Sequence, residues 1–284
     1  MRVTVFGTSG LLGQELVKEL SGEQLTALSS KDADLRDQAR IRDVIRGARP
    51  EWIILAAAYT DVDGCESNRD LVFAVNCQGA IHVAQAARET GSRLIFLSTD
   101  YLFDGTKRSP YEASDTRNPI SVYGESKARA EERLLEILPD VCIVRTSWLF
   151  GHGGQCFPAT ILKLAADRPE IAVVNDQRGC PTFTPDLAST LAQLCRKSAV
   201  GIVHATNSGD CTRYEFAIEI VRASRMPTTV RPVTTAEFPR PARRPAYSVL
   251  SADSLHAYNI HMPEWQDALR RYRGKTPVAP APGV

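Results

Sequence analysis

The sequence lacks long apolar runs, an excess of one charge and any closely spaced pair of cysteines. No apolar segment approaches the roughly 18 residues that a membrane-spanning helix requires. Its 34 lysines and arginines are balanced by 33 aspartates and glutamates, which leaves a formal net charge of +1. Such a chain offers no electrostatic attraction to nucleic acid or to an anionic membrane. We therefore expect neither as a partner.

The cysteines and histidines show no metal-binding arrangement. The seven cysteines are odd in number, scattered and without a C-x-x-C pair, and the five histidines have no ligand spacing. This pattern indicates reduced thiols, a cytoplasmic protein and no zinc site. Because a strand signal starts at residue 2, we also expect no signal peptide.

What the sequence does contain is an alternation of strand and helix signals. With 284 residues, 43% of them hydrophobic, the chain can form one large α/β domain with a substantial core. Short apolar runs are typical of strands buried on both faces of a parallel sheet. We expect an α/β fold with a doubly wound parallel, Rossmann-type sheet. The predicted strands are 2–6, 24–29, 52–55, 93–97 and 141–145, and the predicted helices include 14–20, 37–46, 68–90 and 121–138.

The alternation loosens after about residue 150. We expect residues 1–150 to form a dinucleotide-binding core, and 151–275 a smaller C-terminal substrate lobe interleaved with it. The tail 276–284 is expected to be disordered. Within the lobe, prolines predict extended segments and turns over 227–245. Helices are predicted at 156–167, 186–197 and 212–225, the last opened by a Thr212-x-x-Glu215 capping box.

A glycine-rich turn joins the first strand to the first helix. Gly7 permits a sharp turn, Gly10 lets a ligand approach the backbone, and Gly13 lets the helix pack close to the strand. The helix N-terminus then presents unpaired N–H groups and a partial positive charge to a phosphate. The order strand, glycine turn, helix predicts a dinucleotide site.

A tyrosine and a lysine are spaced for acid catalysis. Tyr123 and Lys127 are four residues apart, so on a helix they share one face. An ammonium beside a phenol is expected to lower the phenol pKa and to make the tyrosine a usable general acid. Taken alone, the pair is also compatible with two ordinary exposed residues. Thr99 at the end of a predicted core strand adds a hydroxyl at the edge where open α/β sheets bind ligands.

The G-x-x-G-x-x-G spacing resembles that of the extended short-chain dehydrogenase/reductase superfamily. Six further segments are similar to the dTDP-4-dehydrorhamnose reductase family. They are 56–63, 98–105, 123–127, 145–148, 174–182 and 241–245. The resemblance covers nearly the whole chain, from residue 1 to about 270. It implies NAD(P)H-dependent reduction of the C4 ketone of a dTDP-4-dehydro-6-deoxyhexose, giving dTDP-L-rhamnose.

The resemblance also implies roles for individual residues. The expected catalytic residues are Tyr123, Lys127 and Thr99. Residues expected at the substrate are Thr60, Val62, Thr99, Asp100, Tyr123, Trp148 and Arg243. The cofactor is expected to contact the glycine turn, the segments that follow the second and third strands, and the catalytic pair. These residues are Gly7, Ser9, Gly10, Leu11, Leu12, Gly13, Ser29, Lys31, Asp34, Leu35, Ala57, Ala58, Tyr59, Thr60, Tyr123 and Lys127.

Some assignments have structural alternatives. Trp148 follows a strand and can instead be a core aromatic residue. Asn76, in the long predicted helix, either holds a water or a backbone kink near the site or caps a buried helix. Arg243 and Arg244 either bind a diphosphate through bidentate hydrogen bonds or form a solvated pair.

The end of the second strand bears on the choice of cofactor. NAD-specific sites place an acidic residue there to bind the ribose 2′-hydroxyl. Here the residues are Ser29, Ser30 and Lys31, which suit a 2′-phosphate, so NADPH is expected and NADH is the alternative. Some relatives hold magnesium with glutamates at a dimer interface. Glu15 could serve here, but Asp186 stands where another acid is needed, so a metal is unsupported and the chain is expected to be a monomer or a homodimer.

Three alternatives to rhamnose synthesis remain. A related dTDP-4-ketosugar reductase of an antibiotic deoxysugar pathway would share these motifs. A dehydratase or epimerase is disfavoured, because Tyr101 follows Asp100 where a dehydratase needs an acid pair. A non-catalytic subunit resembling the regulatory subunit of methionine adenosyltransferase is disfavoured by the intact trio Thr99, Tyr123 and Lys127.

Overall fold

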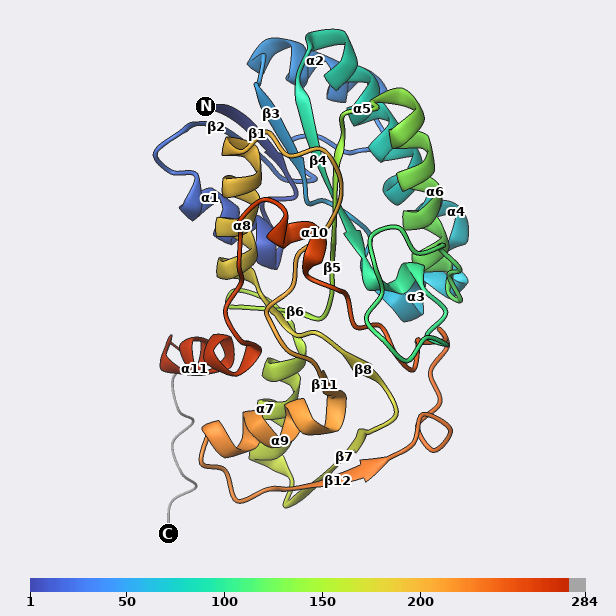
Figure 1. The fold of residues 1–284 in the computed structure, drawn as a ribbon, viewed down its shortest axis with the longest axis vertical. Coiled ribbons are helices and arrows are strands. Elements are labelled where there is room, and N and C mark those ends of the chain that lie inside the picture. Colours follow the sequence, from blue (N-terminus) through green and yellow to red (C-terminus); the bar gives the residue numbers. More distant parts are fainter. Residues whose placement is uncertain (276–284) are drawn as a thin grey trace.

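A six-stranded parallel sheet forms the centre of the computed structural model, which describes residues 1–275 (Figure 1). The strand order is β10-β5-β4-β3-β1-β2, and every pairing is parallel. The doubly wound prediction is therefore confirmed, while the predicted disordered tail 276–284 lies outside the described residues. The strands are β1 (Arg2–Phe6), β2 (Gln24–Leu28), β3 (Trp52–Leu55), β4 (Arg93–Thr99), β5 (Cys142–Thr146) and β10 (Gly201–His204).

Helices cover both faces of this sheet. Successive strand residues point to opposite faces, so Ile54 packs beneath one helical layer and its neighbour Ile53 beneath the other. This two-sided burial explains the continuous apolar runs. One layer contains α1 (Leu11–Glu19) and α8 (Thr184–Arg196), and the other contains α2 (Gln38–Ala48), α5 (Gly79–Thr90) and α6 (Val122–Ile137).

The predicted helix over 68–90 is interrupted. It consists of α4 (Arg69–Phe73), a π-helical turn (Ala74–Gln78) and α5. Asn76 lies in that turn and is buried. Its side chain accepts a hydrogen bond from the backbone N–H of Tyr59 (2.7 Å) and donates to the carbonyl of Tyr59 (3.1 Å) and to Ser126 Oγ (3.1 Å). Asn76 therefore fixes the backbone that follows β3 and links it to α6.

The remaining elements form a lobe at the carboxyl edge of the sheet (Figure 1). The expected helices at 156–167 and 212–225 are present, the second with the predicted Thr212 capping box. The helix expected at 186–197 is α8, which returns to the main sheet and leads into β10, a strand the sequence did not predict. The lobe has its own apolar cluster. Its elements include β6 (Leu149–Phe150), α7 (Phe157–Asp167), β7 (Glu170–Val174), β8 (Arg178–Gly179), β9 (Thr182–Phe183), β11 (Cys211–Thr212), α9 (Arg213–Ala223), β12 (Thr229–Val233) and α11 (Trp265–Lys275).

Three short helical segments complete the described chain. They are α3 (Val62–Ser67), which follows β3, a 3₁₀ helix (Asp100–Leu102), which follows β4, and α10 (Asp253–His256), near the C-terminal end. Among residues 1–275, no helix is long and apolar enough to cross a membrane.

Candidate active site

A cleft of about 520 Å³ lies between the carboxyl edge of the sheet and the lobe. It is lined by the glycine turn, the segments after β3, β4 and β5, the start of α6 and the start of α9. The topology thus brings together motifs that are far apart in the sequence. Of the residues predicted for the site, the cleft contains Gly7, Ser9, Gly10, Leu11, Leu12, Gly13, Ala57, Ala58, Thr60, Val62, Thr99, Asp100, Tyr123, Lys127 and Trp148.

The glycine turn has no room for side chains. Gly7 has φ +93°, and a Cβ there would lie 2.6 Å from the backbone nitrogen of Ala57. A Cβ on Gly13 would lie 2.0 Å from the carbonyl oxygen of Gly7. Gly10 begins α1 without a side-chain cap, which leaves the first N–H groups of the helix for a ligand. The turn therefore fits the diphosphate of a dinucleotide.

A second cavity of about 300 Å³ adjoins the cleft and shares Gly7, Ala57 and Ala58 with it. Ser29, Asp34 and Leu35 line this cavity, as expected for residues beside an adenosine. Arg36 also lines it and pairs with Asp34 at 2.6 Å. The sequence analysis did not identify Arg36.

Two predicted cofactor residues line neither cavity. Lys31 is exposed in the turn after β2, because that turn is closed by Asp32, which accepts hydrogen bonds from the Ser29 backbone and hydroxyl. The backbone N–H and carbonyl of Tyr59 are both hydrogen-bonded to the Asn76 side chain, which fixes the position of Tyr59. That these two side chains contact the cofactor stays a prediction.

Tyr123 is placed by the start of α6. Ser121 caps the helix by accepting a hydrogen bond from the backbone N–H of Gly124. A Cβ on Gly124 would lie 2.1 Å from the carbonyl oxygen of Tyr101, so only glycine allows this close approach. Burial raises the pKa of the Tyr123 phenol well above its usual value, with the Thr99 hydrogen bond opposing and the Asp100 charge adding to the rise.

Lys127 does not produce the expected lowering of the Tyr123 pKa. Its ammonium is almost fully buried and lies 4.0 Å from the centre of the Phe96 ring. Burial lowers the pKa of Lys127 to about 7, and the Glu131 carboxylate opposes this shift. The expectation was wrong for this structure because spacing along a helix does not reveal the loss of hydration at either group.

Thr99 is part of a short hydrogen-bonded chain. Its hydroxyl donates to Asp100 Oδ1 at 3.2 Å and accepts from the backbone N–H of Tyr101 at 3.2 Å. Ser248 Oγ donates to Asp100 Oδ2 at 2.6 Å. Burial raises the pKa of Asp100 to about 6, although these bonds oppose the rise. Ser248, 148 residues beyond Asp100, carried no signal in the sequence.

Two cleft residues have buried hydroxyls without a hydrogen-bond partner. Ser98 and Thr146 line the cleft, and among the described residues nothing is hydrogen-bonded to Ser98 Oγ or Thr146 Oγ1. Buried hydroxyls are normally hydrogen-bonded, and leaving one unpaired is costly. These orphaned groups fit a polar ligand such as a nicotinamide or a sugar.

The lobe side of the cleft contains Trp148 and Arg213. Trp148 has a left-handed backbone (φ +46°), and the Arg213 guanidinium carbon lies 3.6 Å from the centre of its ring. Trp148 thus lines the site rather than only the core. Arg213 was not identified from the sequence.

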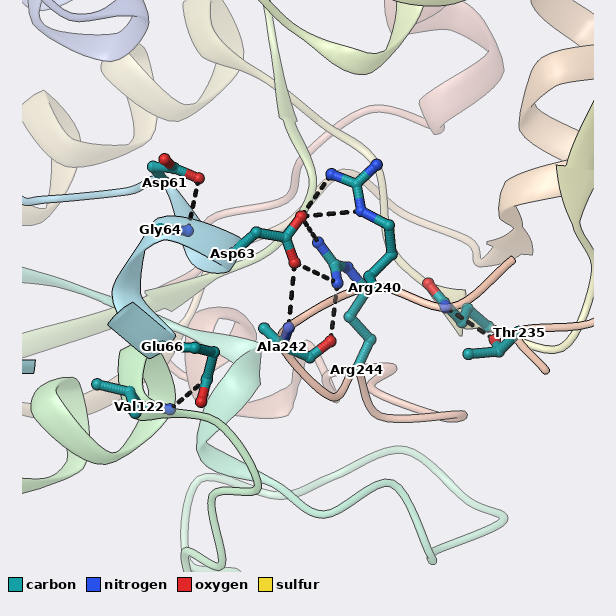
Figure 2. Close-up of polar contacts among 10 residues, drawn as sticks. Asp61, Asp63, Gly64, Glu66, Val122, Thr235, Arg240, Ala242 and Arg244 are labelled. Carbon is teal, nitrogen blue, oxygen red and sulfur yellow. Dashed lines mark hydrogen bonds and ion pairs between the residues drawn. The ribbon is translucent and has the colours of Figure 1, made fainter. Parts of the chain in front are cut away.

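Arg243, which is predicted to contact the substrate, lies outside the cleft. Arg243 is exposed and does not line the cleft. Figure 2 shows instead that Arg240 and Arg244 converge on Asp63. Of the two adjacent arginines, Arg244 therefore already forms an internal ion pair, with Asp63.

The two acids considered for magnesium have protein partners. Asp186 is bound by Arg271 through two contacts of 2.7 Å and accepts from Asn207. Glu15 pairs with Lys18 at 2.7 Å. Within residues 1–275 no cluster of three potential ligands is present.

Comparison with known proteins agrees with this geometry. The family model described as RmlD substrate binding domain matches residues 1–276. A dTDP-4-dehydrorhamnose reductase of Streptomyces griseus is 42% identical over 94% of this chain and 91% of its own length. The spore coat polysaccharide biosynthesis protein SpsK of Bacillus subtilis is 39% identical over 95% of this chain and 96% of its own length.

A solved structure shows the same fold. The dTDP-4-dehydrorhamnose reductase of Bacillus anthracis, in complex with NADP, has a TM-score of 0.94 and 37% identity, over 97% of this chain and 99% of that one. The chain therefore belongs to the dTDP-4-dehydrorhamnose reductase family.

Proposed function

We propose that this chain reduces the C4 ketone of dTDP-4-dehydrorhamnose to give dTDP-L-rhamnose, with NADPH as the reductant. The observation that carries the proposal is that Thr99, Tyr123 and Lys127 line the same cleft as the glycine turn. A reductant held by that turn and a ketone beside the phenol would share one cavity.

Each catalytic side chain has a role that its environment supports. Bound NADPH supplies the hydride. Tyr123 donates a proton to the ketone oxygen, and its raised pKa keeps it protonated at neutral pH. Lys127, with a pKa near 7, supplies an N–H donor beside the phenol. Thr99 holds the phenol or the sugar oxygen through a hydroxyl that Asp100 orients.

The second cavity favours NADPH over NADH. Its lining includes Ser29, Ser30 and Arg36, so hydroxyls and a guanidinium are available to a 2′-phosphate. Its carboxylate, Asp34, already binds Arg36 and is less available to a 2′-hydroxyl. The reductase of Bacillus anthracis also carries NADP.

We also propose a cytoplasmic monomer or homodimer. All seven cysteines are free and buried, and burial raises the thiol pKa of Cys142 and of Cys180 to about 12, which makes them poor nucleophiles. Light scattering during gel filtration measures the oligomeric state. Thiol titration of protein from a cell lysate tests the reduced state.

The activity is tested by mixing the purified chain with NADPH and dTDP-4-dehydrorhamnose. We expect loss of reduced-nicotinamide absorbance and one equivalent of dTDP-L-rhamnose, identified by NMR. A product with the other C4 configuration would indicate an antibiotic-type ketosugar reductase. Tight NADPH binding without oxidation would indicate a non-catalytic subunit and would overturn the proposal.

A further inference from the structure

Arg213 brings a cation to the lobe side of the cleft without a carboxylate partner. It is the first residue of α9, and the Thr212 capping box fixes the start of that helix. Its backbone N–H donates to the carbonyl of Gln177 at 3.2 Å. Among the ion pairs formed within residues 1–275, none includes Arg213. The Tyr101 hydroxyl accepts one hydrogen bond from its guanidinium, and the remaining N–H donors are left for a ligand.

Aromatic rings hold this guanidinium in place. It lies 3.6 Å from the centre of the Trp148 ring and 5.0 Å from that of Phe157. A Cβ on Gly179 would lie 2.7 Å from Trp148 Cε2, so the indole is itself pinned against backbone. A guanidinium stacked on a ring keeps its in-plane N–H groups free to donate in a fork. Arg213 is thus organised before any ligand arrives.

The neighbouring arginines of the lobe are already neutralised. Arg178 pairs with Asp210 and Glu215, and Arg244 pairs with Asp63. Among residues 1–275, the other cation that lines the cleft is Lys127, one helical turn after Tyr123 on α6. Arg213 is therefore the available cation on the lobe side.

The acidic neighbour of Arg213 is also engaged elsewhere. Burial lowers the pKa of Arg213, and the neighbouring Tyr101 and Asp100 oppose this shift. However, the two oxygens of Asp100 accept hydrogen bonds from Thr99 and Ser248. The cleft thus presents a desolvated guanidinium with unused donors, which is a suitable receptor for an anion.

We propose that Arg213 binds the diphosphate of the nucleotide sugar and makes the cleft select a nucleoside diphosphate over the uncharged nucleoside. The inference rests on the proposed function, which supplies the substrate class. A bidentate guanidinium–phosphate contact matches the fork of Arg213. Hydrogen bonds to charged groups of this kind correspond to about 10- to 100-fold in affinity.

Calorimetric titration of the NADP-loaded protein with dTDP and with thymidine tests this proposal. Arg213→Gln should weaken dTDP binding about 10- to 100-fold and leave thymidine binding unchanged. Arg213→Lys, which keeps the charge but loses the planar fork, should give an intermediate loss. Arg222→Gln is the matched control, because Arg222 is an exposed residue of the same helix; it should bind dTDP as the wild type does. In turnover, Arg213→Gln should raise KM more than it lowers kcat.

The outcomes separate this inference from the proposed function. If Arg213→Gln binds dTDP as tightly as wild type, or loses dTDP and thymidine equally, the inference fails. The proposed function still stands if wild type reduces the ketosugar. A wild type that binds neither dTDP nor the ketosugar overturns both. The NADP affinity and the melting temperature show whether each variant is folded. If Arg213→Gln does not fold, Arg213→Lys replaces it in the test. Undiminished dTDP binding by Arg213→Lys would then overturn the inference.

Discussion

The carboxylate of Asp63 receives two hydrogen bonds, each of 3.0 Å, from the guanidinium of Arg244, 181 residues later in the chain. Arg240 and the backbone N–H of Ala242 donate to the same carboxylate (Figure 2). Asp63 lies in α3, directly after the cleft residue Val62. One acid therefore ties a wall of the cleft to the segment that leads to Ser248.

Replacing Asp63 should loosen this tie. Asp63→Asn removes the charge, and we expect it to lower the free energy of unfolding at neutral pH by about 1–3 kcal/mol, since two arginines lose their counter-ion in a partly buried site. Urea unfolding measures the change. Asp70→Asn, an exposed acid of α4, is the control and should have little effect.

The Asp63 effect should depend on pH. Burial by itself would raise the pKa of Asp63, but the hydrogen bonds from Arg244 and Arg240 outweigh it and hold the pKa well below its usual value. A depressed carboxyl pKa stabilises the fold above the unfolded pKa of about 3.9, and this contribution is lost as pH falls toward the folded pKa. The gap between wild type and Asp63→Asn should therefore be constant above about pH 5 and shrink below about pH 4. A gap that widens in acid would contradict this account.

Tyr123→Phe tests the proton donor. We expect turnover to fall roughly 10²- to 10⁴-fold, the usual contribution of general acid catalysis. The affinity for NADPH, measured by nicotinamide fluorescence, should change little because the ring remains. Near-normal turnover would mean that another group delivers the proton.

Lys127 should make the stability of the ligand-free protein rise with pH. Its folded pKa is about 7, whereas an unfolded lysine titrates near pH 10.4. Between these values the unfolded state binds more protons, so the free energy of unfolding rises with pH. Lys127→Met has no side chain that titrates here, so its stability should not show this rise. Its free energy of unfolding relative to wild type should be greatest near pH 7 and decline toward about pH 10. Urea denaturation measures the free energy of unfolding of both proteins at each pH. A difference between them that stays constant from about pH 7 to about pH 10 would refute the prediction.

Gly13→Ala tests the cofactor turn. The added methyl group would lie 2.0 Å from the carbonyl oxygen of Gly7, so α1 must move away from the turn. We expect a loss of about 1–3 kcal/mol in stability and a large loss of NADPH affinity. Gly22→Ala is the control, because nothing lies within 4 Å of a Cβ there. Equal NADPH binding by the two variants would exclude a tight fit at Gly13.

Local patterns in the sequence predicted the sheet well, and the residues predicted to react line one cleft. The glycine turn after β1 and the spacing of Tyr123 and Lys127 are short-range features, and backbone geometry alone determines them. The sequence offered a backbone kink at Asn76 as one alternative, but the π-helical turn could not be derived from it. The bonds of Asn76 reach Tyr59 and Ser126, which no helical periodicity encodes. The short strand β10 was missed because four residues carry little periodic signal.

The residues missed in the site depend on long-range placement. Arg36, Arg213 and Ser248 look like ordinary surface residues in the sequence, and Arg243 looked like a ligand-binding residue. Only the folded chain reveals which guanidinium already has a carboxylate partner, as Arg244 has in Asp63, and which does not.

By itself the sequence determined the alternating strands and helices of the Rossmann-type core, the glycine turn and the placing of Tyr123 and Lys127 one helical turn apart, because each follows from a local pattern of residues. The tertiary structure decided which cation lines the lobe side of the cleft, what orients Asp100, and how burial shifts the pKa values of Tyr123 and Lys127. Desolvation and ion pairing depend on every element packed around a group, and those elements come from segments more than a hundred residues apart.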